Sequence, residues 1–117
     1  ADQFRLTELV ERYNRLVELA RARRLPPQDT GGSIATVTNY GVFGLTMATP
    51  IPLPEQTLLL GMGVGQTTPF WNPESKTFEP VTEAQFTLSF DHRVLDGGAA
   101  GRLLLRVKDL LNSPEDL

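Results

Sequence analysis

The chemistry available to this sequence centres on a single histidine. His92 is the only histidine among the 117 residues, and the chain has no cysteine. Histidine is the one side chain whose ordinary pKa lies close to neutral pH, so His92 is the first candidate for a general base. The alternative is a histidine whose ring makes only a structural hydrogen bond to a backbone carbonyl. The residues alone leave both interpretations open.

Asp96 follows His92 by four residues, and three roles compete for its carboxylate. It is a candidate partner for the imidazole, a metal ligand, or the cap of a helix that begins near Gly98. A metal site needs more ligands than one His and one Asp, and neither a second His nor a Cys is present. An aspartate at a helix start accepts free backbone N–H groups and contributes about 1 kcal/mol. We therefore expect no metal and a structural role for Asp96.

Two other patterns have simpler explanations. A triad of Ser89, His92 and Asp96 requires Ser89 to face His92, but the alternation of side chains along a strand places them on opposite faces. The run Gly61-Met62-Gly63-Val64-Gly65 lacks the G-x-G-x-x-G spacing of a dinucleotide loop, and no helical pattern follows it. We interpret these glycines as bends in a strand.

The hydrophobic periodicity predicts the elements that hold these side chains. Apolar residues at three- and four-residue steps predict a helix over about residues 3–23, ended by Pro26 and Pro27. Strands are expected over residues 33–38 and 57–64, with an irregular proline-containing segment over 47–55 between them.

Further along, residues 71–76 are typical of a hairpin turn, with the return arm starting near Phe78. Phe86, Leu88 and Phe90 alternate with polar residues, which indicates a half-buried strand, and His92 continues the same parity. A second helix is expected over residues 99–111, opened by a cap at Asp96 or Gly97. This order of helix, strands and helix predicts an α+β sandwich.

Composition narrows the possible ligands. Hydrophobic residues make up 40% of the chain and charged residues 21%, which predicts a packed core. The net charge of -3 gives no broad basic field, so nucleic acid is not expected as a partner. No apolar run is long enough for a membrane span. The chain begins with Ala inside a helical pattern, and we expect preceding sequence upstream.

The segment from Asp91 to Gly97 contains the pattern H-x-x-x-D-G, which resembles the active-site signature of dihydrolipoamide acyltransferases, chloramphenicol acetyltransferase, and the condensation and plant acyltransferases. The preceding Leu88-Ser89-Phe90 and the helix close to the C-terminus are similar to the dihydrolipoamide acyltransferases of 2-oxoacid dehydrogenase complexes. The glycine-led stretch over residues 31–44, Thr49-Pro50-Ile51 and the strand after it continue this likeness. The resemblance extends over nearly the whole chain.

The resemblance implies a two-layer, chloramphenicol-acetyltransferase-like α/β sandwich with a mixed sheet. It implies that residues 1–117 are the C-terminal portion of one catalytic domain, with the upstream half, the lipoyl domains and the subunit-binding domain absent. It also implies a homotrimer within a larger core, active sites at subunit interfaces, and 2-oxoacid decarboxylase and dihydrolipoamide dehydrogenase components as partners. The location expected is the cytoplasm of a bacterium or the mitochondrial matrix of a eukaryote.

The mechanism implied by the resemblance is acyl transfer between two thiols, those of lipoyl-bound dihydrolipoamide and coenzyme A. His92 would remove the thiol proton, and the hydroxyl of Thr38 would stabilise the carbonyl oxygen as it becomes negative. Many members of the family have serine at this position. Asp96 would brace the histidine loop through an arginine, and Asn39 and Gly97 would contact coenzyme A. The lipoyl group would belong to a domain outside this chain.

Two departures and two alternatives accompany this expectation. Thr38 keeps the hydroxyl but adds a methyl, and Pro52-Leu53-Pro54-Glu55 differs from the asparagine-proline run usual in the family. The alternatives are a non-catalytic scaffold domain and an acyltransferase with an alcohol or amine acceptor. The fragment by itself is expected to be inactive, because half of the pocket walls would be missing.

Overall fold

A computed structural model describes residues 4–114 of the chain. The chain divides into two units by its internal contacts. One unit comprises residues 33–107, and the other comprises the remaining described residues on either side of it. The candidate site residues all belong to the unit of residues 33–107.

Helix α1 (Leu6–Arg21) leaves out residues 4, 5, 22 and 23 of the predicted range, and the predicted residue 3 lies outside the described residues. At its start, the Arg5 backbone N–H donates to the Glu8 carboxylate at 3.0 Å, and this acid also suits the positive end of the helix dipole. At its end, Arg23 adopts a left-handed conformation with φ 55°, and the N–H groups of Arg23 and Arg24 donate back to carbonyls of the last turn. This left-handed turn ends the helix before Pro26 and Pro27 are reached, so the predicted role of the prolines is wrong.

The unit of residues 33–107 is built on a three-stranded mixed sheet in the order β1-β2-β5. Strand β1 (Ala35–Asn39) pairs in parallel with β2 (Leu58–Met62), and β2 pairs antiparallel with β5 (Phe86–Phe90). The proline-containing segment between β1 and β2 has no regular strand or α-helix, as predicted, and returns the chain to the same end of the sheet. The parallel pairing of β1 and β2 requires this return.

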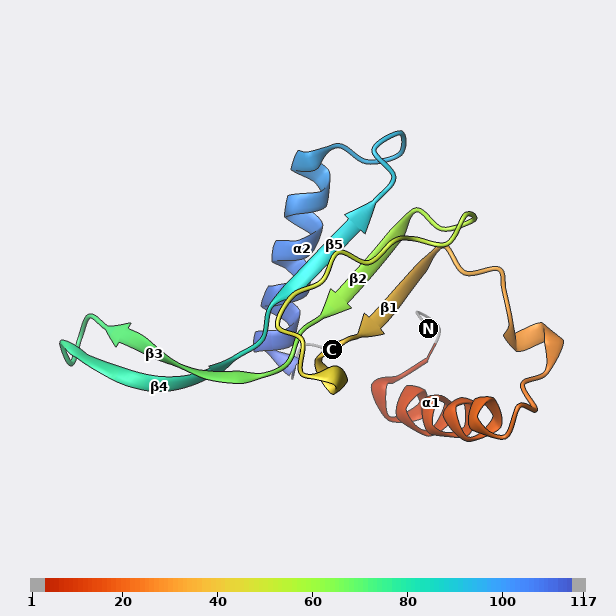
Figure 1. Cartoon of the computed structure of the whole chain (residues 1–117), viewed down its shortest axis with the longest axis horizontal. Coiled ribbons are helices and arrows are strands. Elements are labelled where there is room, and N and C mark those ends of the chain that lie inside the picture. Colours follow the sequence, from red (N-terminus) through yellow and green to blue (C-terminus); the bar gives the residue numbers. More distant parts are fainter. Residues whose placement is uncertain (1–3, 115–117) are drawn as a thin grey trace. The chain divides into compact units, whose positions relative to one another are not determined.

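Helix α2 (Gly97–Asn112) covers one face of that sheet, as Figure 1 shows. Its apolar residues Leu103, Leu104 and Val107 line a space of about 150 Å³ together with side chains of all three strands. The strand residues on this face include Leu58, Leu60 and Leu88. Helix and sheet therefore form two layers, and the predicted α+β class and mixed sheet are confirmed.

The strands β3 (Gln66–Asn72) and β4 (Thr77–Glu83) form a separate two-stranded hairpin that extends away from the sheet in Figure 1. Its turn lies over residues 73–76, close to the predicted position, and Asn72 accepts backbone N–H groups of Glu74 and Ser75. Trp71 and Phe78 are directly opposite each other, with ring centroids 5.2 Å apart. No helix among residues 4–114 is long and apolar enough to cross a membrane.

Candidate active site

His92 lies immediately after β5, in the loop that leads into α2, and its side chain is exposed. The ring lies beside that of Phe90, with centroids 5.5 Å apart and planes tilted by 40°. The loop is tied to the sheet because the Asp91 N–H donates to the Thr57 carbonyl at 2.9 Å. A rigid strand end thus presents an accessible imidazole, which suits a proton-transfer group better than a histidine held in the core.

The residues on either side of His92 form an ion pair with each other. Both oxygens of the Asp91 carboxylate accept hydrogen bonds from the Arg93 guanidinium, the shortest at 2.7 Å from Nη2 to Oδ2. The Arg93 backbone N–H also donates to Asp91 Oδ1 at 2.9 Å. The guanidinium hydrogen bonds, and next the backbone N–H, lower the pKa of Asp91 from 3.8 to about 2, and the same pairing raises the pKa of Arg93.

Asp96 is the N-cap of α2. Its Oδ1 accepts a hydrogen bond from the Ala99 backbone N–H at 2.7 Å, and its own carbonyl accepts from Ala100 at 3.0 Å. This geometry agrees with the structural role favoured by the sequence. The ion pair seen in this loop joins Arg93 to Asp91, and the bracing of the loop by an arginine on Asp96 stays a prediction.

Gly97 and Gly98, which follow Asp96, have ordinary backbone angles, so what matters at these positions is the space around a missing side chain. Neither Gly97 nor Gly98 has a positive φ, so the loop does not need them for a left-handed turn. A Cβ at Gly98 would lie 3.2 Å from Asp96 Oδ1 and 3.3 Å from the Arg102 guanidinium, whereas a Cβ at Gly97 would meet nothing within 4 Å. Gly97 therefore leaves open surface beside the loop.

Thr38 lies in β1, half-buried, in a row that runs across the sheet through Gly61 of β2 to Thr87 of β5. The Tyr40 hydroxyl is 3.1 Å from the Thr87 hydroxyl. A Cβ at Gly61 would lie 2.6 Å from the Tyr40 ring and 2.7 Å from Thr87 Oγ1. The glycine therefore makes room for a small polar cluster beside Thr38. Asn39 follows on β1, opposite Met62, with an exposed side chain.

Thr38 and His92 are not brought together within one chain. Phe90 lies in the row of Leu58 and Ala35, which is three residues along β1 from Thr38. These two rows are roughly 10 Å apart along the strands at about 3.3 Å per residue, and His92 follows Phe90 beyond its row, at the end of the sheet away from Thr38. Phe90, beside which the His92 ring lies, also faces the side of the sheet opposite to that of Thr38. A site that uses both groups needs a second copy of the chain.

Sequence reasoning missed two features of the site. The Asp91–Arg93 pair was signalled only by opposite charges on both sides of the histidine, and the turn that brings the two side chains together was not predicted. The Tyr40–Thr87 contact joins residues far apart in the sequence, and nothing local indicates it.

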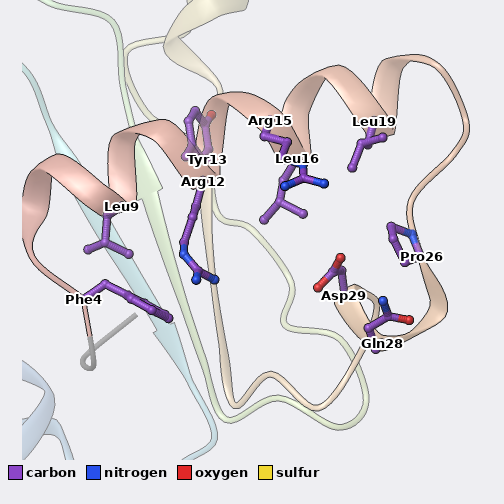
Figure 2. A pocket seen from close by; sticks show the side chains of 10 residues that line it. All are labelled: Phe4, Leu9, Arg12, Tyr13, Arg15, Leu16, Leu19, Pro26, Gln28 and Asp29. Atoms are coloured by element: carbon purple, nitrogen blue, oxygen red, sulfur yellow. The ribbon is translucent and has the colours of Figure 1, made fainter.

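A second concave region belongs to the unit that contains α1. Figure 2 shows Phe4, side chains of α1, and Pro26, Gln28 and Asp29 around a cavity of about 610 Å³. Its wall combines leucines with the charged side chains Arg12, Arg15 and Asp29, and none of the predicted site residues lines it. Within residues 4–114 no group of three or more acidic or histidine side chains is arranged to hold a metal ion.

All 117 residues match the family model of the 2-oxoacid dehydrogenases acyltransferase (catalytic domain). The chain belongs to this family. It is 38% identical over 117 residues to the dihydrolipoyllysine-residue succinyltransferase component of the 2-oxoglutarate dehydrogenase complex of Bartonella vinsonii subsp. berkhoffii. It is 34% identical over 110 residues to the dihydrolipoyllysine-residue acetyltransferase component of the pyruvate dehydrogenase complex of Azotobacter vinelandii.

Solved structures confirm the fold expected from the resemblance. A dihydrolipoamide acetyltransferase of Azotobacter vinelandii, studied for the role of a serine, a histidine and an asparagine in catalysis, superposes with a TM-score of 0.84 at 35% identity over 94% of this chain. The cubic core of a pyruvate dehydrogenase multienzyme complex gives the same TM-score at 34% identity. The chain covers 44% of each of those two chains. The match to the Bartonella relative covers 100% of this chain but only 28% of that relative's length.

Proposed function

We propose that this chain provides the histidine, and in a neighbouring copy the hydroxyl, with which a dihydrolipoamide acyltransferase moves an acyl group between dihydrolipoamide and coenzyme A. The observation that carries the proposal is the exposed His92 at a strand-to-helix junction, in a chain of this acyltransferase family. Support also comes from the Azotobacter enzyme, whose studied asparagine follows its histidine by four residues, as Asp96 follows His92.

The proposed reaction needs one base and one oxyanion donor. A ring nitrogen of His92 takes the proton from the coenzyme A thiol, and the resulting thiolate attacks the carbonyl carbon of the acyl-dihydrolipoyl thioester. The carbonyl oxygen becomes negative in the tetrahedral intermediate, where the Thr38 hydroxyl donates a hydrogen bond to it. The bond to the dihydrolipoyl sulfur then breaks, and the imidazolium returns the proton to that sulfur.

The groups near His92 fit this role. Asp91 is already neutralised by Arg93, so the loop places no unpaired carboxylate on the strand end beside the imidazole. The N-terminus of α2 follows the loop, capped by Asp96, and fixes where the loop ends. Asn39 and Gly97, one with an exposed side chain and one beside open surface, are proposed to contact coenzyme A.

The first test replaces His92 by Ala in the full-length protein. Acyl transfer between acyl-coenzyme A and dihydrolipoamide should fall by roughly 100-fold or more, the usual contribution of a general base. Transfer within tenfold of the wild-type rate would overturn the base assignment. Wild-type protein that transfers no acyl group to dihydrolipoamide, but retains its assembly, would favour a scaffold domain or another acceptor.

A second test addresses the pairing of Thr38 with His92 across copies. His92→Ala and Thr38→Val chains are dissociated, mixed one to one and reassembled, each chain lacking one of the two groups. If a site takes His92 from one copy and Thr38 from the next, about a quarter of the sites regain both groups and activity returns in that proportion. Activity that stays at the level of the separate variants would exclude a shared site.

We propose further that the chain acts as part of a homotrimer within a larger core, together with the decarboxylase and dihydrolipoamide dehydrogenase components of its complex. The cubic core among the similar structures supports this proposal. The corresponding location is the bacterial cytoplasm or the mitochondrial matrix. Sedimentation of the full-length protein tests the assembly, since a monomer at assay concentration would contradict it.

A further inference from the structure

The ion pair around His92 is unusually well connected for a surface pair. The guanidinium of Arg93 makes three hydrogen bonds to Asp91, between 2.7 and 3.1 Å, and the Arg93 backbone N–H makes a fourth at 2.9 Å. The Asp91 side chain is 22% exposed and that of Arg93 is 89% exposed. A forked, two-oxygen pairing of this kind fixes geometry as well as charge.

The pair closes a ring of atoms that contains the backbone of His92. The ring runs from the Asp91 carboxylate through the guanidinium to the Arg93 backbone and back across the histidine. Further hydrogen bonds hold the same turn, from the Val94 and Leu95 N–H groups to the Asp91 carbonyl at 2.9 and 3.1 Å. The Asp91 N–H also donates to the carbonyl of Thr57, the residue immediately before β2. The backbone angles of His92 are thus restrained from both sides.

We propose that Asp91 and Arg93 are positioning residues that hold the His92 ring in its reactive orientation. This inference rests on the proposed function, because it gives the pair a role in that reaction. A base contributes only when its nitrogen lies within hydrogen-bond reach of the thiol. A misplacement of about 1 Å can cost roughly 100-fold in rate. Since the ring is exposed and packs only against Phe90 among the aromatic residues described, the backbone restraint has to supply much of its order.

Two other roles for the pair predict different results. A merely structural ion pair on an exposed surface contributes little to stability, so its loss would leave the turnover number, kcat, unchanged. A guanidinium that binds the phosphates of coenzyme A would instead raise KM when Arg93 is replaced and leave Asp91→Asn without the same effect. The positioning role requires both residues equally.

The test measures kcat, KM for coenzyme A and thermal stability in the full-length protein. The variants are Asp91→Asn, Arg93→Gln, the double variant and Arg93→Lys. The control is Glu79→Gln in the hairpin, since the Glu79 carboxylate likewise accepts two side-chain hydrogen bonds. Each single variant should lose roughly tenfold in kcat with KM little changed, a part of the 100-fold that a 1 Å misplacement can cost. Its thermal midpoint should fall but stay above the assay temperature, so that the loss of kcat does not come from unfolding.

The double variant should be no slower than either single variant, because each change already breaks the same ring. Arg93→Lys keeps the positive charge but cannot make the paired hydrogen bonds of a guanidinium. It should therefore regain less than half of the kcat that Arg93→Gln loses. A crystal structure of Asp91→Asn should show His92 in more than one rotamer. Single variants within twofold of wild-type kcat, or additive losses in the double variant, would overturn the proposal.

His92→Ala is assayed in parallel to separate this inference from the function on which it rests. If His92→Ala remains active, the base assignment fails whatever the Asp91 and Arg93 variants do. If His92→Ala is inactive while both single variants behave as wild type, the positioning role fails and the proposed function stands.

Discussion

The Ala99 backbone N–H donates a hydrogen bond to the Asp96 carboxylate at 2.7 Å, and this bond joins the histidine loop to α2. Replacing Asp96 by Ala leaves that N–H without its partner and should lower the free energy of unfolding by about 1 kcal/mol. Asp96→Asn retains a capping oxygen and should cost only a few tenths of that amount. Urea denaturation followed by circular dichroism measures both. An Asn variant as unstable as the Ala variant would show that the charge, and not the cap, is what matters.

Two glycines should respond to alanine in opposite directions. A Cβ at Gly61 would lie 2.6 Å from the Tyr40 ring, so Gly61→Ala has to displace packed atoms and should lower the free energy of unfolding by about 1–3 kcal/mol. A Cβ at Gly101 meets nothing within 4 Å, and this residue lies inside α2. Gly101→Ala should therefore raise the free energy of unfolding by roughly 0.5–1 kcal/mol. Urea denaturation of Gly61→Ala and Gly101→Ala measures both free energies of unfolding. A change of the same sign in both variants would contradict the packing around Gly61.

The Asp91–Arg93 pair should make stability depend on acid pH. The pKa of Asp91 is about 2 in the folded chain and 3.8 ordinarily, so the folded state binds this proton less readily than the unfolded state. The stabilisation is therefore complete above the ordinary value and is lost as the pH falls from about 4 to about 2. Denaturation midpoints of wild type and Asp91→Asn should converge over this range. Parallel curves down to pH 2 would argue against the pairing in solution.

Thr38 should matter for its hydroxyl and not for its methyl. Thr38→Val removes the donor at nearly constant volume and should lower kcat by roughly 100- to 1000-fold, the loss typical of an oxyanion donor. Thr38→Ser keeps the donor and should stay within tenfold of wild type. Steady-state assays of the full-length protein with acetyl- and succinyl-coenzyme A measure both effects. A Val variant with normal kcat would remove Thr38 from the mechanism.

The sequence pattern predicted the secondary structure best where an element depends on residues that are close together in the chain. The alternation of Phe86, Leu88 and Phe90 places β5 correctly, and the cap at Asp96 fixes the start of α2. The end of α1 was predicted less well, because a left-handed residue such as Arg23 has no strong sequence signal when it is not glycine.

By itself, the sequence determined that one histidine follows a half-buried strand and precedes a capped helix, because strand parity and helix capping depend on residues only a few positions apart. The tertiary structure decided that Thr38 shares a row with Gly61 and Thr87, that this row is far from His92 in one chain, and that Asp91 and Arg93 enclose the histidine. Strand register joins segments distant in sequence, and side-chain hydrogen bonds depend on rotamers, so neither follows from local periodicity.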